Sequence, residues 1–259
     1  MTIHPSAVID SGAELGPEVE VGPFCTIGPD VRLGRGVVLR PHVHLAGHTT
    51  IGAETQIFSF ASVGEFPQDK KYKGEPTRLV IGERNVIREY VTMHPGTAGS
   101  AGLTTVGDDN LFMIGVHVGH DCQIGSDGTF SNGAQLAGHV IVEDYAVLSG
   151  NCGTVQFVRI GESAMVGAMA GVNQDIAPFS ICTGSPARLF RANKINMERR
   201  GFSKEKIEMV ERAYRIIFRS GLLARAAFAQ VREELSESPE AERMVAFLEK
   251  SERGFARHR

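Results

Sequence analysis

Tryptophan is absent from the 259 residues, and there are only four cysteines. The cysteines Cys25, Cys122, Cys152 and Cys182 form no CxxC pair and no closely spaced framework. Their spacing argues against a disulfide-stapled domain or a zinc knuckle and is typical of reduced thiols in the cytosol. We therefore predict a cytoplasmic protein.

Long apolar runs are also missing. No run is long enough to cross a bilayer, so we predict no membrane span. The first ten residues lack a charged segment followed by an apolar one, so no secretion signal is visible. The net charge of -3 is too small to indicate a nucleic-acid or membrane-surface partner.

The charge is nevertheless unevenly distributed. Residues 188–259 carry 17 Lys and Arg against 11 Asp and Glu, whereas residues 1–187 carry 10 against 19. A basic C-terminal part suggests an acidic partner, although a solvated basic surface fits the charge equally well.

A repeat of six residues is present instead. Every sixth residue from Ile3 to Val63 is aliphatic, and the series resumes from Ile81 to Met93. After a shift of one residue it runs from Val106 to Val172, where only Thr154 is not apolar. Neither a helix nor a single strand has this period, which is typical of a parallel β-helix built from hexapeptides. Cys25, Cys122 and Cys152 fall on its small inward position, which indicates a packing role.

The repeat divides the chain into two predicted domains. We expect residues 1–187 to form an all-β left-handed parallel β-helix, with the hand taken from the resemblance among hexapeptide proteins. Residues 64–80 and 94–105 interrupt the repeat and are expected to be external loops. Residues 188–259 should form a small α-helical domain, with helices near 203–220, 222–237 and 239–250.

Histidines gather in one stretch of the repeat. His117, His120 and Asp121 lie on one coil, and His139 follows His120 by 19 residues, about one coil later. An imidazole beside a carboxylate is a plausible general base. Histidines can also simply cover the flat face of a β-helix, but three together favour a site.

Five motifs occur in order along the chain: GEPTR at 74–78, MHPGT at 93–97, HVGHDC at 117–122, LAGHV at 136–140 and RRGFS at 199–203. Together they resemble the acyl-carrier-protein–UDP-N-acetylglucosamine O-acyltransferases, the LpxA family, which open lipid A biosynthesis. The resemblance covers essentially the whole chain. It implies a homotrimer that transfers an (R)-3-hydroxyacyl chain from acyl carrier protein to the 3-hydroxyl of UDP-N-acetylglucosamine. It implies no cofactor and no metal, since the phosphopantetheine arm arrives on the carrier protein.

The resemblance also assigns roles to residues. His120 would be the general base, Asp121 would orient it, and the Gly138 N–H would stabilise the oxyanion. Substrate contacts are implied for Gln68, Asp69, Lys71, His117, His139, Gln156, Asn193 and Arg199, the last two for the phosphopantetheine arm. Ala168 stands where the family limits acyl length, and we expect a somewhat shorter chain than the glycine form takes.

The chain departs from the family at Val155, where a histidine is usual, and at Gly133 and Ser185, where the family has asparagine. Alternatives therefore stay open. His117, His120 and His139 could instead bind zinc, as in a γ-carbonic anhydrase of the same fold. A sugar N-acyltransferase acting one step later and an inactive binding scaffold are the others. Acyl length, and the choice between a 3-hydroxyl and a 3-amino sugar, are not determined by the sequence.

Overall fold

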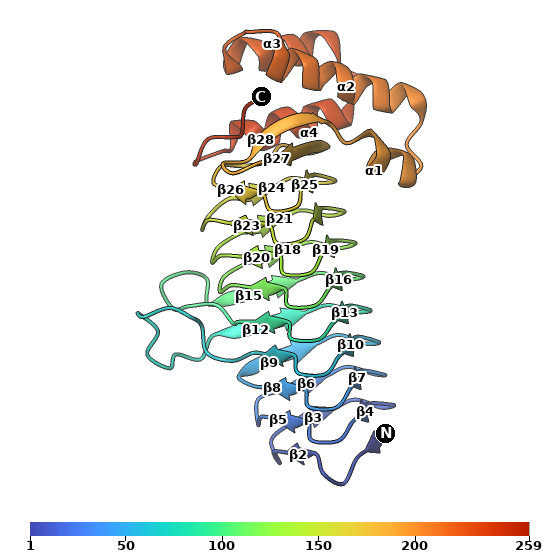
Figure 1. Ribbon diagram of the computed structural model, residues 1–259, viewed down its shortest axis with the longest axis vertical. Helices are drawn as coiled ribbons and strands as arrows, with labels where there is room; N and C mark the ends of the chain where they lie inside the picture. The colour runs from blue at the N-terminus through green and yellow to red at the C-terminus, as the bar shows by residue number, and fades with distance from the viewer. Residues whose placement is uncertain (259) are drawn as a thin grey trace.

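The computed structural model describes residues 1–258. It is a three-sided left-handed parallel β-helix with four helices at its C-terminal end (Figure 1). Successive strands join three sheets in turn, so each of the strands β1 to β23 pairs with the third strand after it, as β1 does with β4 through Thr2 and Glu20. The predicted fold class is confirmed.

Each sheet forms one face of the prism. Face A contains β1 (Thr2–Ile3), β4 (Glu20–Val21), β7 (Val38–Leu39), β10 (Gln56–Ile57), β13 (Val86–Ile87), β16 (Leu111–Phe112), β19 (Thr129–Phe130), β22 (Val147–Leu148), β25 (Met165–Val166), β27 (Ser180–Thr183) and β28 (Arg188–Ala192). Face B contains β2 (Val8–Ile9), β5 (Thr26–Ile27), β8 (His44–Leu45), β11 (Ser62–Val63), β14 (Thr92–Met93), β17 (His117–Val118), β20 (Gln135–Leu136), β23 (Gly153–Thr154) and β26 (Gly171–Val172). Face C contains β3 (Glu14–Leu15), β6 (Arg32–Leu33), β9 (His48–Ile51), β12 (Arg78–Ile81), β15 (Leu103–Val106), β18 (Gln123–Ile124), β21 (Ile141–Val142) and β24 (Arg159–Ile160).

The chain passes from face A to face B to face C and back to face A. We call the turns between them the A–B, B–C and C–A corners. The repeat residues end the strands and point inward, where nearly all of them are buried. Phe112 and Phe130 stack inside the prism with ring centroids 4.6 Å apart. Burying this aliphatic column supplies most of the driving force for folding.

All four cysteines are buried and free, as their place in the repeat predicts. Burial raises the pKa of the Cys122 thiol to about 12, and the thiol donates a hydrogen bond to the Ala137 carbonyl at 3.2 Å. Only the thiolate is strongly nucleophilic, so Cys122 is poorly suited to covalent catalysis.

Both predicted loops leave the prism at the B–C corner, and they lie on the left of Figure 1. Each is shorter at its C-terminal end than predicted, because strands begin at Arg78 and Leu103. Strand β12 pairs over four residues with both neighbours, and its side chains alternate between exposed and buried. These four residues alternate with a period of two, and so short a stretch could not be distinguished from the six-residue repeat in the sequence.

The helices are α1 (Lys194–Arg199), α2 (Lys204–Arg219), α3 (Ala224–Glu234) and α4 (Pro239–Glu249). The last three agree with the expected helices to within a few residues. Helix α1 was not predicted, because its six residues are too few to show a helical period. Strand β28 pairs antiparallel with β27 and extends face A past residue 187, so the helices themselves begin at Lys194.

Within the part of the chain that the structure describes, no helix combines the length and the apolar character needed to span a membrane.

Candidate active site

A buried histidine–aspartate pair lies at the B–C corner, in the turn between β17 and β18. His120 Nδ1 is 2.8 Å from Asp121 Oδ2, and the two residues are only 7% and 5% exposed. The sequence placed these side chains next to each other along the chain. The structure adds that they bond to each other and are held away from bulk water.

The second loop fixes the carboxylate. The Thr97 N–H donates to both oxygens of Asp121, at 3.0 and 3.1 Å, and the Thr97 hydroxyl donates to Oδ2 at 2.8 Å. The Asp121 N–H donates to the Thr104 hydroxyl at 2.8 Å. Because a carboxylate only accepts hydrogen bonds, we assign the imidazole hydrogen of His120 to Nδ1. Nε2 is then free to accept a proton.

Gly138 lies one coil further on and directly against the His120 ring. A Cβ at Gly138 would come within 2.6 Å of both Cε1 and Nε2 of His120. The Gly138 N–H has no hydrogen-bond partner among residues 1–258. A backbone donor without a partner beside an imidazole is the arrangement an oxyanion site requires.

His139 lies across the pair, also on the coil of Gly138. Its Nε2 is 3.7 Å from Asp121 Oδ2, its ring is perpendicular to that of His120 at 5.0 Å, and it stacks on Phe157 at 4.3 Å. Burial lowers the pKa of His139, partly offset by the negative charges of Asp121 and Asp69. A neutral ring is therefore favoured, and it can hydrogen-bond a polar ligand.

His117 lies on strand β17, and its ring faces that of another histidine. Its Nδ1 is 2.9 Å from the Thr92 hydroxyl. Burial, reinforced by the positive charges that His94 and His120 can carry, lowers the pKa of His117 to about 4. His117 is therefore neutral at pH 7 and suited to hydrogen bonding rather than to proton transfer.

His94 belongs to this cluster, although it was not selected from the sequence. It is buried, its ring centroid is 5.3 Å from that of His117, and its Nδ1 is 2.9 Å from the Glu65 carbonyl. Its Nε2 is buried without a partner within residues 1–258. The signal was available, because His94 is the histidine of the MHPGT motif.

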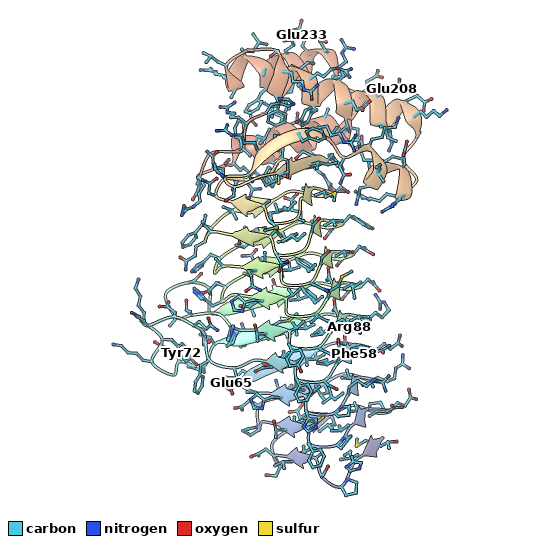
Figure 2. All side chains as sticks on the ribbon, viewed as in Figure 1. Phe58, Glu65, Tyr72, Arg88, Glu208 and Glu233 are labelled. Atoms are coloured by element: carbon cyan, nitrogen blue, oxygen red, sulfur yellow. The ribbon has the colours of Figure 1, made fainter. Side chains whose placement is uncertain are left out.

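Three predicted substrate contacts lie on the first loop, at the same corner. Gln68 and Lys71 are exposed and Asp69 is half-buried. The Lys71 N–H donates to Asp69 Oδ1 at 2.9 Å, which shapes the turn between them. Glu65 and Tyr72 mark this loop in Figure 2, and Tyr72 packs its ring against Phe66 at 5.8 Å.

Gln156 follows Gly138 on the same corner, one coil further, and is exposed. Val155, beside it, is 42% exposed. The resemblance leads us to expect a histidine at this position, and the valine side chain has no hydrogen-bonding group.

The remaining predicted contacts lie elsewhere in the chain. The Asn193 amide is 3% exposed, donates to the Ser163 carbonyl at 2.8 Å and caps α1, so it already has structural bonds. Arg199 is exposed on α1, which lies above the C–A corner, on the opposite side of Figure 1 from the loops. Ala168 is exposed at the A–B corner, between β25 and β26. A single chain therefore does not bring these residues to His120, and their roles stay predictions.

The proposed zinc triad is not assembled either. Within residues 1–258, the ligand atoms that lie within 4.8 Å of one another belong to His120, Asp121 and His139, whereas His117 is outside the group. Since Asp121 is already bound to His120 and Thr97, this cluster is arranged as a hydrogen-bonded base.

Comparison with known proteins identifies the family of this chain. A family model described as UDP-N-acetylglucosamine O-acyltransferase, domain 2, matches residues 175–256, and a bacterial transferase hexapeptide model matches residues 12–47. The acyl-[acyl-carrier-protein]–UDP-N-acetylglucosamine O-acyltransferase of Burkholderia lata is 50% identical, over 98% of this chain and 99% of that protein. The enzyme of the same name from Anaeromyxobacter sp. (strain K) is 46% identical, over 99% and 100%.

Solved structures agree as well. LpxA from Acinetobacter baumannii superimposes with a TM-score of 0.96 at 42% identity, over 99% of this chain and 100% of that one. The UDP-N-acetylglucosamine acyltransferase of Francisella novicida gives a TM-score of 0.96 at 38% identity, over 99% and 94%. The chain therefore belongs to the acyl-[acyl-carrier-protein]–UDP-N-acetylglucosamine O-acyltransferase family.

Proposed function

We propose that this O-acyltransferase moves an (R)-3-hydroxyacyl chain from acyl carrier protein directly to the 3-hydroxyl of UDP-N-acetylglucosamine, at the start of lipid A biosynthesis. The observation that supports it best is the buried His120–Asp121 pair beside the free Gly138 N–H. This combination supplies a base and an oxyanion donor on adjacent coils.

The proposed reaction uses both groups. His120 Nε2 takes the proton of the sugar 3-hydroxyl, and the oxygen attacks the thioester carbonyl. The Gly138 N–H donates to the oxygen that becomes negative, while Asp121 stabilises the imidazolium through Nδ1. The attack forms the new C–O bond. Collapse of the tetrahedral intermediate then re-forms the carbonyl and breaks the C–S bond, and the departing thiolate takes the proton from His120. The inert Cys122 thiol is consistent with transfer without an acyl-enzyme.

We also propose that the active unit is a homotrimer. The predicted site residues are divided among three corners of one prism, with His120 at B–C, Arg199 above C–A and Ala168 at A–B. Only a neighbouring copy could unite them in one cleft. Face A presents both polar and apolar outward side chains, and the apolar ones, which include Val38, Leu111 and Val147, are suited to a subunit contact.

The carrier protein supplies the phosphopantetheine arm, so the proposal requires no cofactor and no metal. Arg199 on the basic C-terminal part is available for the phosphate of that arm. The reaction is proposed to occur in the cytoplasm, which stays a prediction from the sequence.

The test is acyl transfer from a panel of hydroxyacyl carrier proteins to UDP-N-acetylglucosamine, with a chelator present in a parallel series. We expect product from the native chain in both series, and a loss of about 10²- to 10⁴-fold in His120→Ala. His4→Ala, at an exposed histidine far from the cluster, is the matched control.

Running Ala168→Gly on the same panel should shift the preferred donor to a longer chain.

Absence of product with every donor would contradict the O-acyltransferase proposal, provided that the protein is folded. The corresponding 3-amino sugar would then be tested as the acceptor. Loss of activity with the chelator alone would indicate a metal-dependent reaction at His120, Asp121 and His139 instead.

A further inference from the structure

The loop that carries Gln68, Asp69 and Lys71 leaves the β-helix at Glu65, and a histidine from the coil directly below holds this point. Glu65 Oε1 is 2.8 Å from His44 Nε2, and His44 Nδ1 is 2.5 Å from the Thr26 hydroxyl. The carboxylate can only accept, so Nε2 carries the hydrogen and Thr26 donates to Nδ1 of the neutral ring. His44 is on strand β8 of face B, outside the cluster around His120.

Glu65 is also held from the other side. Its carbonyl oxygen is 2.9 Å from His94 Nδ1, and its second carboxylate oxygen accepts from the Phe66 N–H at 3.2 Å. Gly64, directly before it, has φ +90° and lies so close to the Ala46 carbonyl that a Cβ would clash with that oxygen. The first residues of the loop are therefore fixed between two histidines, while Lys71 beyond them is exposed.

We propose that His44 is a positioning residue for sugar-nucleotide binding: by binding Glu65 it sets the start of the first loop. The inference rests on the proposed function, because the loop is there assigned to the sugar nucleotide. Its geometry is independent of the His120 base.

The charges around the pair favour this contact. Among residues 1–258, the titratable residues that line the surface groove at this point are Asp10, His44 and Glu65, and His94 faces the Glu65 backbone from the coil above. The hydrogen bond from His44 lowers the pKa of Glu65. Glu65 is thus ionised at neutral pH and accepts from His44, and no Lys or Arg of the described residues lines the groove to compete for the carboxylate.

The size of the effect follows from exposure. The side chains of His44 and Glu65 are 41% and 43% exposed, so water and salt weaken their attraction. A change of about two- to fivefold in affinity is therefore expected, rather than an on–off switch. The effect should also decrease at high salt.

The kinetic test compares two substitutions of His44. His44→Val removes the hydrogen bond, and we expect the KM for UDP-N-acetylglucosamine to rise about two- to fivefold, with kcat and the KM for the acyl donor unchanged. His44→Gln keeps a hydrogen-bond donor, so its KM for the sugar nucleotide should stay close to the native value. A native KM in His44→Val, or an equal change in both KM values, would overturn the proposal.

His48→Val is the matched control. His48 is also a histidine on a strand of the β-helix and beside a carboxylate, with Nδ1 3.6 Å from Asp30 Oδ1, but it makes no hydrogen bond to the first loop. We expect the KM of His48→Val for the sugar nucleotide to equal that of the native protein. If the KM rose as much in His48→Val as in His44→Val, the effect would not be specific to the contact with the loop, and the proposal would be overturned.

A second measurement does not depend on activity. Amide hydrogen exchange over residues 65–73 should be faster in His44→Val and in Glu65→Gln than in the native protein at the same pH, and unchanged in His48→Val. Unchanged exchange in both loop variants would overturn the positioning role even in an active enzyme. If exchange were faster in the loop variants but the native protein transferred no acyl chain, the His44–Glu65 contact would be supported and the proposed function would be contradicted.

Discussion

Two residues of the active site adopt the left-handed backbone conformation that most side chains avoid. Asp121 has φ +60° and His139 has φ +62°. The same conformation recurs at corner residues without any proposed role, such as Glu54 and Tyr90, so it is a property of the β-helix corner. Backbone strain therefore does not identify this site, whereas the contacts of Asp121 with His120 and Thr97 do.

Gly138 offers the sharpest test at the scale of single residues. Gly138→Ala should lower kcat about 10²- to 10³-fold, because the added methyl group would displace the His120 ring and disturb the oxyanion donor. Steady-state kinetics with a melting curve would measure it. Gly28→Ala is the control, since a Cβ there meets nothing closer than 3.5 Å. A native kcat in Gly138→Ala would contradict the close placement of Gly138 against the His120 ring, since the backbone N–H is unchanged by this substitution.

His117 predicts a pH dependence of stability. Burial lowers its pKa from 6.5 to about 4, so the unfolded chain binds this proton more readily than the folded chain. Stability from this group is complete above pH 6.5 and falls as the pH approaches 4, by an amount on the order of 2 kcal/mol. Urea denaturation at pH 7 and pH 5 should show a smaller loss for His117→Gln than for the native chain. Equal losses would exclude a depressed pKa.

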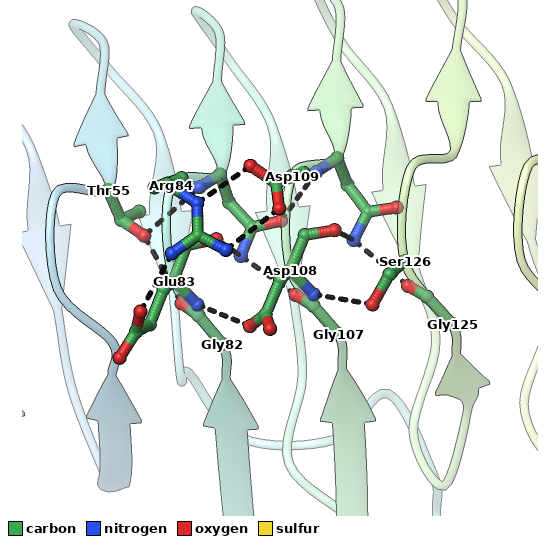
Figure 3. Close-up of polar contacts among 11 residues, drawn as sticks. Thr55, Gly82, Glu83, Arg84, Gly107, Asp108, Asp109, Gly125 and Ser126 are labelled. Carbon is green, nitrogen blue, oxygen red and sulfur yellow. Dashed lines mark hydrogen bonds and ion pairs between the residues drawn. The ribbon is translucent and has the colours of Figure 1, made fainter.

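At the scale of elements, the coils are tied together by polar side chains as well as by the apolar column. At the C–A corner, Asn85 donates to the Gly107 carbonyl, and Asn110 donates to the Gly125 carbonyl one coil later. The Asn110 N–H in turn donates to Asn85 Oδ1 at 3.0 Å. Figure 3 shows this corner, where Asp108 and Ser126 form a parallel outer row of bonds.

Asn110→Ala should therefore lower the free energy of unfolding by about 1–3 kcal/mol, because it leaves the Gly125 carbonyl and the Gly128 N–H without partners. Asn132→Ala, at an exposed asparagine, should cost less than about 0.5 kcal/mol. Urea titrations at one protein concentration would measure both, since an oligomer's apparent stability depends on concentration. Equal costs would show that the internal ladder adds no stability.

The elements differ in how far the sequence predicted them. Every two-residue strand ends on a residue of the hexapeptide series, because one inward position per strand is enough to specify it. The helix α1 and the starts of β12 and β15 were not predicted, since each depends on contacts outside its own few residues. Asn193 illustrates this, because the residue that caps α1 also donates to the Ser163 carbonyl, 30 residues away along the chain.

At the scale of the whole molecule, the proposed site is divided between copies. His120 and Arg199 lie at different corners, so each active site would take one residue from each of two neighbours. The basic C-terminal part would then lie beside a neighbour's histidines, where an acidic carrier protein could deliver its arm.

Mixed oligomers test this arrangement. Chains with His120→Ala and chains with Arg199→Ala should each be weakly active, but their mixtures should regain up to about a quarter of the native sites, because one copy can supply each residue. A mixture of His120→Ala with Asp121→Ala should stay inactive, since both residues belong to the same corner. Activity after co-expression and after refolding of the purified chains would measure the rescue. No rescue would contradict a shared site.

The sequence by itself determined the β-helix and the buried thiols, and it predicted His120 as the base, because a period of six and a linear motif are local properties that can be read without coordinates. Only the tertiary structure decided that Thr97 holds Asp121, that Gly138 lies against His120, and that His44 binds the first loop. Each of these contacts joins residues about one coil or more apart, and their distances depend on how the coils stack and on where the loops return. Side-chain geometry of this kind has no signature in the repeat.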